Sequence, residues 1–387
     1  MEFEVRGLAG RRDTVAYQLD SRVNIFFGLN GTGKTSLLKI LHSALEDEPN
    51  VLLDVPFRSA RVVIYSHTLK RTFERTITRK HMGTTKERDS YQLAIELGKV
   101  EGHAASGAYE EMVRQRSEFD GWHTKPSVPL SGLIHCYLTT SRMASDLLGS
   151  RWTQYVPVAM DSPERQLDRL FATQIQRLWR SYTNNLLSEI RGIQEAGLAE
   201  ILHSVLFPPG TDTAPTSLSA KAAFDRVNNF LGRQGRRRAG AFETFSDSYK
   251  RNAQIRSVVH DIDSIERRIE RAEEPRRRLI ELIKQFVGKD KEVIFDDNEI
   301  KVKAHGQEIA LYSLSSGEKQ LIRILVETIG AEANTVMIDE PELSMHIDWQ
   351  RYLVEAMHLI NPGAQIILAT HSPEIMENVA DEKIYRL

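Results

Sequence analysis

Hydrophobic and polar residues alternate near the N-terminus with the period of a half-buried strand. Phe3 and Val5 alternate with charged neighbours, and a short apolar run from Val23 to Phe27 ends abruptly at Gly28. Period-two alternation predicts strands within residues 1–27, and the apolar run predicts a buried strand. The same kinds of pattern predict a helix over 35–45 and strands within 60–79, 91–97 and 133–138.

The pattern changes to a helical period in the middle of the chain. Apolar residues recur every three or four positions, and one set of isoleucines, Ile255, Ile262 and Ile269, recurs every seven. A repeat of about two to three heptads predicts a helical hairpin rather than a long coiled coil. Pro275 is expected to interrupt or kink the helix that carries these isoleucines, because proline removes a backbone donor. The predicted helices span 162–206, 218–232 and 243–273, with a continuation to Phe286.

Strands return after residue 287, and the last third of the chain then alternates helices with strands. Asp297 and Asn298 predict the turn of a hairpin between the first two of these strands. The expected elements are strands near Val293, Ile300 and Ile309 to Leu311, helix 317–330, strand 335–339, helix 347–359, strand 365–369, helix 373–379 and strand 383–387. This order predicts one α/β domain made from both ends of the chain, 1–160 and 289–387, with a helical insertion at 161–288.

The composition is that of an ordinary globular protein. The 387 residues are 41% hydrophobic and 27% charged, which excludes wholesale disorder and a collagen-like chain. Cys136 is the single cysteine, so an internal disulfide cannot form and a reducing compartment is expected. No apolar run approaches the roughly 20 residues needed to cross a bilayer, and the N-terminus has no signal pattern. We therefore expect a soluble, cytoplasmic protein with no membrane contact.

The net charge of −2 conceals an uneven distribution. Residues 221–289 hold 17 Lys and Arg against 10 Asp and Glu, and the densest points are Arg236–Arg238 and Arg276–Arg278. A basic helical arm is suited to contacting the phosphates of DNA. Docking of a protein partner is an equally good interpretation, and a solvated face with i,i+4 ion pairs is the structural alternative.

The segment from Gly28 to Thr35 matches the phosphate-binding loop (P-loop) pattern G-x-x-x-x-G-K-[ST] at every defined position. A strand is predicted before it and a helix after it, which is the context that the pattern requires. Glycines allow backbone N–H groups to converge on phosphate oxygens, and the helix N-terminus adds positive potential. Lys34 is expected to reach the β- and γ-phosphates of a nucleotide, and Thr35 to ligate Mg²⁺. The predicted nucleotide-binding residues are Asn30, Gly31, Thr32, Gly33, Lys34, Thr35 and Ser36.

Two acidic residues stand at the end of the apolar strand 335–339. Carboxylates that follow buried apolar residues need a compensating cation or polar partner, and Asp339 and Glu340 are in this position. In a P-loop protein Asp339 supports Mg²⁺ through its water shell, and Glu340 polarises the attacking water. An ordinary surface turn is the alternative for this segment on its own.

Two further motifs suggest how the site is completed. Ser315 is placed to cap the helix over 317–330, and the N–H groups around Gly317 form a second anion-binding site. One nucleotide does not need two helix N-termini from one chain, so we expect a head-to-tail dimer in which each P-loop faces Ser315 and Gly317 of the other chain. His371 follows another apolar strand, where it is placed to hydrogen-bond the γ-phosphate or the attacking water. Simple helix capping and a structural histidine are the respective alternatives.

Together and in this order, the four motifs resemble those of the ATP-binding cassette (ABC) ATPase superfamily, and within it the SMC/RecF-like and OLD-like branch. Residues 314–320 (LSSGEKQ) stand where the family has its LSGGQ-like signature. Residues 338–350 (IDEPELSMHIDWQ) resemble its Walker B and D-loop run, and residues 370–373 (THSP) resemble its switch-histidine segment. The resemblance is strong over about 1–45 and 305–387 and weak over 100–290.

The resemblance implies an ABC-ATPase head, which is a P-loop sheet with flanking helices and an antiparallel β subdomain, here with a helical insertion. It implies ATP and Mg²⁺ bound between two heads, with Lys34, Thr35, Asp339, Glu340 and His371 from one chain and Ser315 with Gly317 from the other. One position departs from the family pattern. No Q-loop glutamine is evident after the early strands, and Thr139–Arg142 occupies its place.

The leading hypothesis is an ATPase whose dimer state is controlled by nucleotide. In OLD-like proteins a Toprim nuclease domain often follows such a head, but only 16 residues follow His371, so we expect effector chemistry from a separate protein. The architecture is similar to ATPase subunits of bacterial antiphage defence systems such as PARIS and Septu, which control a separate nuclease or toxin. The alternatives are a RecF- or SMC-like DNA-repair ATPase and a nucleotide-gated scaffold with little turnover, and a transporter cassette fits least.

Overall fold

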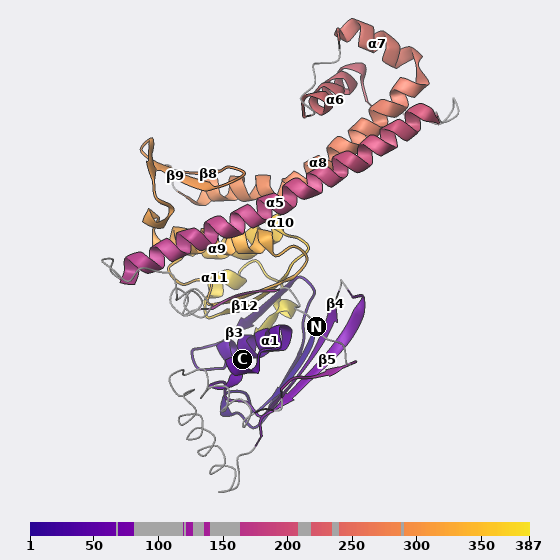
Figure 1. Cartoon of the computed structure of the whole chain (residues 1–387). Coiled ribbons are helices and arrows are strands. Elements are labelled where there is room, and N and C mark those ends of the chain that lie inside the picture. Colours follow the sequence, from indigo (N-terminus) through magenta and orange to yellow (C-terminus); the bar gives the residue numbers. More distant parts are fainter. Residues whose placement is uncertain are drawn as a thin grey trace, which may run out of the picture. The chain divides into compact units, whose positions relative to one another are not determined.

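The structure is a computed structural model that describes residues 1–66, 69–80, 119, 121–126, 135–139, 163–207, 218–233, 240–287 and 290–387 (Figure 1). These residues divide into two compact units, of which unit 1 is Met1–Ile175 with Ile309–Leu387 and unit 2 is Gln176–Glu308. Unit 1 therefore combines both ends of the chain. The predicted limits of the insertion, 161 and 288, lie 15 and 20 residues before those of unit 2. The strand predicted over 91–97 falls outside the described residues.

One of the two sheets that the described residues form in unit 1 is a parallel sheet of five strands, to which both ends of the chain contribute. Its strands are β3 (Val23–Phe27), β7 (His135–Leu138), β11 (Thr335–Asp339), β12 (Gln365–Thr370) and β13 (Ile384–Arg386). They lie in the order β13-β3-β12-β11-β7, and every neighbouring pair is parallel. Nearly every residue of β11 and β12 is buried, as a parallel sheet that is covered on both faces requires.

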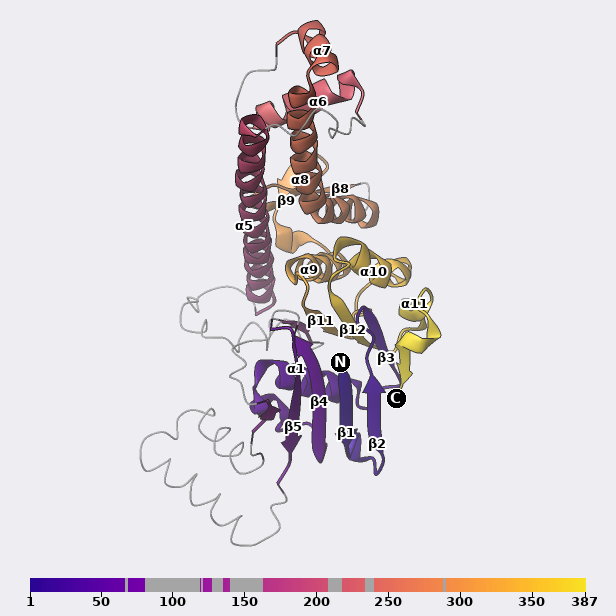
Figure 2. The same ribbon diagram turned by 90° about the vertical axis from the view of Figure 1, so that its right-hand side faces the viewer.

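A second, antiparallel sheet forms the rest of the β structure in unit 1 (Figure 2). It consists of β1 (Glu2–Arg6), β2 (Thr14–Gln18), β4 (Ser59–Ser66), β5 (Arg71–Thr78) and β6 (His123–Lys125), in the order β2-β1-β4-β5-β6. Burial alternates along β4 and β5, so one face of this sheet packs against the core and the other faces solvent. The antiparallel β subdomain expected of an ABC-ATPase head is therefore present.

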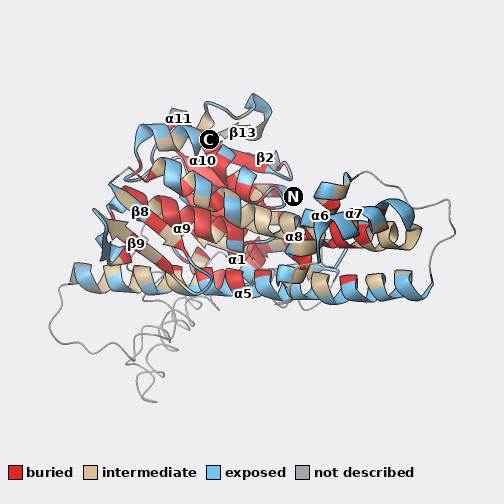
Figure 3. Ribbon diagram, turned by 90° about the horizontal axis from the view of Figure 1, so that it is seen from above, coloured by how far each residue is buried: buried red, intermediate tan, exposed pale blue. Residues whose placement is uncertain are grey.

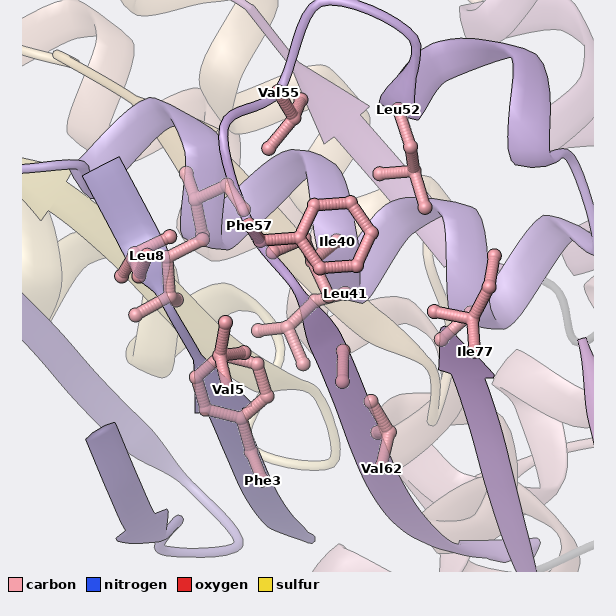
Figure 4. Packing of buried hydrophobic residues seen from close by; sticks show 14 of the residues in the cluster. Phe3, Val5, Leu8, Ile40, Leu41, Leu52, Val55, Phe57, Val62 and Ile77 are labelled. Atoms are coloured by element: carbon pink, nitrogen blue, oxygen red, sulfur yellow. The ribbon is translucent and has the colours of Figure 1, made fainter. Parts of the chain in front are cut away.

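Helix α1 (Lys34–Glu46) is enclosed by both sheets. Ile40 and Leu41 belong to one hydrophobic cluster that includes residues of β1 and β4 as well as Met337 of β11 and Ile367 of β12. Figure 4 shows Ile40 and Leu41 among the side chains of the antiparallel strands. Close packing on both sides leaves little room for α1 to move, so the loop that precedes it is held in a fixed place.

Helices and strands alternate at the C-terminal end, as predicted. Helix α9 (Ser316–Gly330) is buried along most of its length, and α10 (Ile347–Ile360) connects β11 to β12 (Figure 3). Helix α11 (Pro373–Met376) follows β12, and short 3-10 helices span Leu8–Gly10, Pro49–Leu52, Leu311–Ser313 and Asp381–Lys383. The strand predicted to reach Leu311 is wrong at its end, because the buried Leu311 begins a 3-10 turn. The hydrophobic pattern cannot distinguish the two, because a single buried apolar residue can end a strand or begin a 3-10 turn.

Unit 2 consists of long helices and a small sheet. Its elements are α5 (Pro163–Leu206, from Gln176 onward), α6 (Ala220–Arg233), α7 (Phe242–Arg251), α8 (Ala253–Phe286), β8 (Lys291–Phe295), β9 (Ile300–Ala304) and β10 (Gln307–Ile309). Strands β8 and β9 form the predicted antiparallel hairpin. No helix among the described residues combines the length and the apolar character that a membrane crossing needs.

The helix predicted over 243–273 is two helices, α7 and α8. They are separated at Asn252, whose side chain accepts hydrogen bonds from the backbone N–H groups of Gln254 and Ile255 and so caps α8. Of the two outcomes expected at Pro275, an interruption or a kink, the interruption is wrong, since α8 continues through this residue to Phe286. Buried residues beyond the proline, such as Leu279, keep that part of α8 packed against its surroundings.

The β8–β9 hairpin belongs to unit 2 because α5 holds it by side chains. The buried Trp179 indole donates a hydrogen bond to the Asp296 carbonyl at 2.6 Å, and its ring contacts Phe295 edge-on at 4.9 Å. Gln176 of α5 both donates to the backbone carbonyl of Ile300 and accepts from its N–H. These contacts explain why unit 2 ends at Glu308, after the hairpin, rather than at residue 288, where the helical pattern predicts the end of the insertion.

The seam of seven-residue spacing is buried between α5 and α8. Ile262, Ile265 and Ile269 form a hydrophobic cluster with isoleucines of α5 and with Phe230 of α6. The two helices lie close together at Gly197, where an added Cβ would lie 2.3 Å from Cγ1 of Ile265. The heptad spacing therefore correctly predicts a helical hairpin. The close contact at Gly197 could not be predicted, because this glycine is not part of the heptad pattern.

Substitution of two glycines of α5 tests this packing. Gly197→Ala is expected to lower the free energy of unfolding by about 1–3 kcal/mol, because the fully buried Ile265 must move to accommodate the methyl group. Gly192→Ala is the matched control, since nothing lies within 4 Å of an added Cβ there. Better helix propensity should raise stability by about 0.5–1 kcal/mol in this variant. Urea unfolding followed by circular dichroism measures both, and equal stabilisation by the two substitutions would contradict the close contact.

Candidate functional site

The predicted site residues gather at the carboxyl ends of three adjacent parallel strands. The P-loop follows β3, Asp339 is the last residue of β11, and His371 follows β12. The register pairs Phe27 with Thr370 and Ala369 with Asp339, so the three strands end at the same level. Ligand sites of open α/β sheets lie at this edge. The order of the strands therefore brings together motifs that lie hundreds of residues apart.

The P-loop has the backbone that phosphate binding needs. Gly31 and Gly33 adopt left-handed conformations, with φ of 85° and 100°. Gly33 is also the N-cap of α1, and it supplies no side-chain hydrogen bond to the first turn. The N–H groups of that turn are therefore left for an anion. Asn30 and Gly31 are exposed, and the Thr32 hydroxyl donates to the Leu29 carbonyl at 2.9 Å.

Lys34 lies buried within the P-loop. Its side chain donates from Nζ to the carbonyl oxygens of Gly28 at 2.7 Å and Leu29 at 3.1 Å. Lys34 is only 5% exposed, so its ammonium group is directed into the P-loop rather than into solvent. An ammonium group held in this position is suited to phosphate oxygens, which are stronger acceptors than backbone carbonyls.

Thr35 and Asp339 form the link between α1 and the parallel sheet. The Thr35 hydroxyl donates to Oδ2 of Asp339 at 2.8 Å, and Asp339 is fully buried. A hydroxyl oxygen and a carboxylate oxygen are ligands that Mg²⁺ accepts, and it usually retains waters beside them. The two residues predicted as metal ligands are thus brought together and fit this ion. Ser36, the next residue of α1, is half-buried.

Glu340 adopts a backbone conformation that is unusual for a residue with a side chain. Its φ is 49°, and its N–H donates to the Ala369 carbonyl of β12 at 2.7 Å. Left-handed backbone costs about 1–3 kcal/mol at such a residue and occurs where surrounding structure enforces it, often at functional sites. Its carboxylate Oε1 lies 3.9 Å from Nδ1 of His371, so the predicted catalytic acid and switch histidine are neighbours.

Glu342 holds the segment that carries His371, and the sequence analysis did not identify it. Its Oε1 accepts a hydrogen bond from the Thr370 hydroxyl at 2.7 Å and from the His371 N–H at 2.9 Å. The same oxygen lies 3.0 Å from Nδ1 of His371. A third carboxylate just after the acid pair was the available signal, but its partners lie 28 and 29 residues further along the chain.

Gln350 connects the histidine segment to the loop after β11. Its amide oxygen accepts from the Ser372 hydroxyl at 2.7 Å, and its amide nitrogen donates to the Met345 carbonyl at 2.9 Å. Both bonds are made by one side chain, so the loop after β12 and the loop after β11 are fixed to each other. Sequence reasoning gave this residue no role of its own, although it is the last residue of the run 338–350 that resembles the Walker B and D-loop segment.

The predicted capping role of Ser315 is confirmed. Its hydroxyl accepts from the Glu318 N–H, and the Glu318 carboxylate accepts from the Ser315 N–H at 2.7 Å, which completes a capping box at the start of α9. Gly317 lies against the loop after β11, where an added Cβ would be 2.4 Å from the Ser344 carbonyl oxygen. Only glycine permits this approach without a shift of the backbone.

A pocket of about 570 Å³ opens beside this capped helix end. Ser315, Ser316 and Gly317 line one side of it, and the residues of 344–349 other than Ile347 line the other. No P-loop residue belongs to the lining. The structure thus brings Lys34, Thr35, Asp339, Glu340 and His371 together, and places Ser315 and Gly317 at a separate pocket.

Lys319 ties α9 to the start of α5. Its Nζ lies 2.6 Å from Oδ1 of Asp168, and the lysine side chain is 9% exposed. The Q-loop position lies elsewhere, after β7. Thr139 is described there as the residue next to the strand end, whereas residues 140–142 fall outside the described part of the chain.

The arginines of α8 that were predicted to contact nucleic acid are paired with carboxylates. Arg276 lies 2.6 Å from Asp297, and the next two arginines both pair with Glu274. These pairs favour the structural alternative for Arg276–Arg278, a helical face whose charge is balanced internally. Arg236–Arg238 lie outside the described residues, so DNA contact through them stays a prediction.

A pair of histidines joins α1 to the edge strand β7. Nδ1 of His42 lies 2.7 Å from Nε2 of His135, so one ring donates and the other accepts. Burial, followed by the neighbouring His135, lowers the pKa of His42 from 6.5 to about 4. The His42 ring is therefore neutral near pH 7.

A P-loop after β3, a histidine after the central strand β12 and an acid pair at the end of β11, all at one edge of the sheet, define an ATPase domain of the ABC and SMC-like type. The family described as "AAA domain, putative AbiEii toxin, Type IV TA system" matches residues 155–377, which is more than half of the chain. The chain belongs to this family.

The chain is also similar to individual proteins, either over a short segment or at low sequence identity. "Retron Vc95 probable ATPase" of Vibrio cholerae serotype O1 biovar El Tor is 33% identical over 99 residues, which are 22% of this chain and 19% of that protein. The chain thus matches only about a fifth of this curated relative. The Smc head domain of Pyrococcus furiosus, solved with the C-terminal domain of ScpA, aligns with 97% of this chain and 90% of its own at 12% identity and a TM-score of 0.40. The SMC head domain of Thermotoga maritima has the same coverage and identity and a TM-score of 0.38.

Acidification tests the histidine pair. Unfolded His42 takes up a proton around pH 6.5, whereas folded His42 resists protonation until about pH 4, so the free energy of unfolding should fall as pH drops through this window. His42→Gln keeps a hydrogen-bonding group but cannot titrate, and it should lose less stability between pH 7 and pH 4.5. Urea unfolding at several pH values measures the difference. An identical pH dependence in the two proteins would contradict the lowered pKa.

Proposed function

We propose that this protein binds ATP with Mg²⁺ and hydrolyses it. The observation that carries the proposal is the hydrogen bond between Thr35 and Asp339 at 2.8 Å, at the edge where Lys34, Glu340 and His371 also lie. A chance P-loop pattern has no reason to meet a buried acid from a strand 304 residues away. The family to which the chain belongs, described as an AAA domain, supports the same conclusion.

Each residue has a defined task in this proposal. Lys34 and the N–H groups of the P-loop bind the phosphates, and Glu340 orients and polarises the attacking water. Thr35 and Asp339 hold Mg²⁺, which neutralises charge on the β- and γ-phosphate oxygens when it is bound. His371 contacts the reacting region from the other side of Glu340, and its loss of that contact after hydrolysis reports the nucleotide state.

We further propose that two copies complete each other's sites head to tail. The pocket beside Ser315 and Gly317 has no P-loop residue in its lining, so within one chain the two halves of a nucleotide site stay apart. Apolar side chains around both halves support a protein contact there. Leu29 in the P-loop is 80% exposed, and Leu343 and Ile347 beside the pocket are 39% and 46% exposed.

The biological role that we propose is the sensor or regulatory subunit of a bacterial antiphage defence system, which controls a separate nuclease or toxin. Similarity to a retron ATPase and to a family described by a toxin–antitoxin system supports this role. A RecF- or SMC-like role in DNA repair has less support from the described residues, because the arginines of Arg276–Arg278 are engaged by acids. The cytoplasm is the compartment expected for either role.

Two variants separate binding from turnover. Lys34→Ala removes the buried cation from the phosphates and should weaken ATP binding about tenfold to hundredfold. Glu340→Gln keeps the phosphate contacts but cannot polarise water, so it should bind ATP normally, lose about 100-fold or more in turnover, and accumulate the ATP-bound dimer. Equilibrium binding, phosphate release and light scattering measure these three properties.

Matched controls lie on the same helices. Lys39→Ala on α1 and Glu355→Gln on the exposed face of α10 change the same residue types outside the site, and both should behave as the unmodified protein. Unchanged ATP affinity in Lys34→Ala would refute the phosphate-binding assignment. Full turnover in Glu340→Gln would remove Glu340 as the residue that acts on water.

A further inference from the structure

One buried carboxylate oxygen makes every contact between Glu342 and the histidine segment. The Glu342 side chain is 5% exposed, and its Oε1 meets the Thr370 hydroxyl at 2.7 Å, the His371 N–H at 2.9 Å and His371 Nδ1 at 3.0 Å. The second oxygen, Oε2, is buried and makes no hydrogen bond. A buried carboxylate is destabilising unless hydrogen-bond donors satisfy it, so these contacts are strongly constrained.

The chemistry of this contact fixes the state of the imidazole. An ionised carboxylate only accepts hydrogen bonds, so the 3.0 Å distance from Oε1 favours a hydrogen on Nδ1 of His371 over a lone pair there. In the neutral ring Nε2 is then an acceptor, which suits the O–H of a water. In the protonated ring Nε2–H is a donor, which suits a phosphate oxygen. The opposite neutral tautomer, with hydrogen on Nε2 alone, would place the Nδ1 lone pair against the carboxylate and is disfavoured.

Glu340 does not fix the ring in this way. Its Oε1 lies 3.9 Å from the same Nδ1, which is beyond hydrogen-bonding distance. Glu342 also holds the His371 backbone, so ring and main chain are oriented by the same group. Glu340 and Glu342 thus have different surroundings. Of these two carboxylates, only Glu342 lies within hydrogen-bonding distance of the His371 ring.

We propose that Glu342 is the positioning residue of His371. It holds the imidazole with hydrogen on Nδ1 and thereby keeps Nε2 as the atom that meets the attacking water or the γ-phosphate. The inference rests on the proposed ATP hydrolysis for its effect on rate. The tautomer itself does not depend on turnover, which allows the two proposals to fail separately.

The first test is the state of His371 in the unmodified full-length protein. Two-bond ¹H–¹⁵N correlation spectra distinguish the two neutral tautomers, and the His371 signals are assigned by their loss in His371→Gln. We expect hydrogen on Nδ1. Hydrogen on Nε2 alone would overturn the proposal whatever the ATPase rate, and a protein without any ATPase activity but with the expected tautomer would overturn only the proposed function.

The second test removes the charge of Glu342 and keeps its size. In Glu342→Gln the amide oxygen can still accept from Thr370 and the His371 N–H, but the negative charge that favours a hydrogen on Nδ1 is gone, so the preference for this tautomer is weakened. We expect kcat to fall about tenfold to hundredfold with ATP affinity changed by less than about threefold, and the tautomer of His371 to become mixed. Glu374→Gln is the matched control, because Glu374 accepts from the Ser372 hydroxyl at 2.8 Å on the same segment.

A double variant distinguishes positioning from a purely structural role. If Glu342 acts through the histidine, Glu342→Gln should cause no further loss of kcat in the His371→Ala background. The same loss in both backgrounds, with an unchanged His371 tautomer, would show that Glu342 only stabilises the turn and would overturn the proposal. Should Glu342→Gln fail to fold, the tautomer of the unmodified protein still decides the question.

Discussion

The hydrogen bond from Thr35 to Asp339 is the contact on which the rest of the site depends. It joins the helix after the P-loop to the strand that carries the acid pair, across 304 residues of sequence, and Asp339 is fully buried. Its geometry is possible because α1 is enclosed between two sheets and β11 is paired on both sides. Lys34 is the first residue of α1, and Glu340, with its left-handed backbone, directly follows β11. Fixing α1 and β11 therefore also fixes these two residues.

The site is linked by short contacts to the region that would meet a second copy. Ser372, next to the switch histidine, bonds to Gln350, and Gln350 bonds to the carbonyl of Met345. The adjacent Ser344 carbonyl packs against Gly317, which lines the pocket at the start of α9. A displacement at the histidine therefore has a continuous packed connection to the pocket. This connection is the physical basis for expecting nucleotide state and dimer state to depend on each other.

Local patterns predicted the chemistry of the chain better than its arrangement. The P-loop, the acid pair and the capped Ser315 each occupy the place that their own sequence predicts, because strand ends and helix caps are local features. The order of the parallel strands and the partners of Glu342 depend on contacts between distant segments, which a single sequence does not reveal. The break at Asn252 had a local signal, a capping residue within a helical period. The β8–β9 hairpin joined the helices because of Trp179, whose indole bonds to the backbone of the hairpin at 2.6 Å.

The central claim is that one nucleotide site forms from the P-loop edge of one copy and the Ser315–Gly317 pocket of another. Mixing two inactive variants tests it directly. Lys34→Ala disables the P-loop, and Ser316→Glu places a negative charge in the pocket at an exposed position that favours acids. Each variant alone should lack ATPase activity, and an equimolar mixture should recover about a quarter of the unmodified activity, because half of the dimers then hold one intact site. A mixture that stays inactive while Ser316→Glu still binds ATP, or full activity of Ser316→Glu alone, would contradict the account.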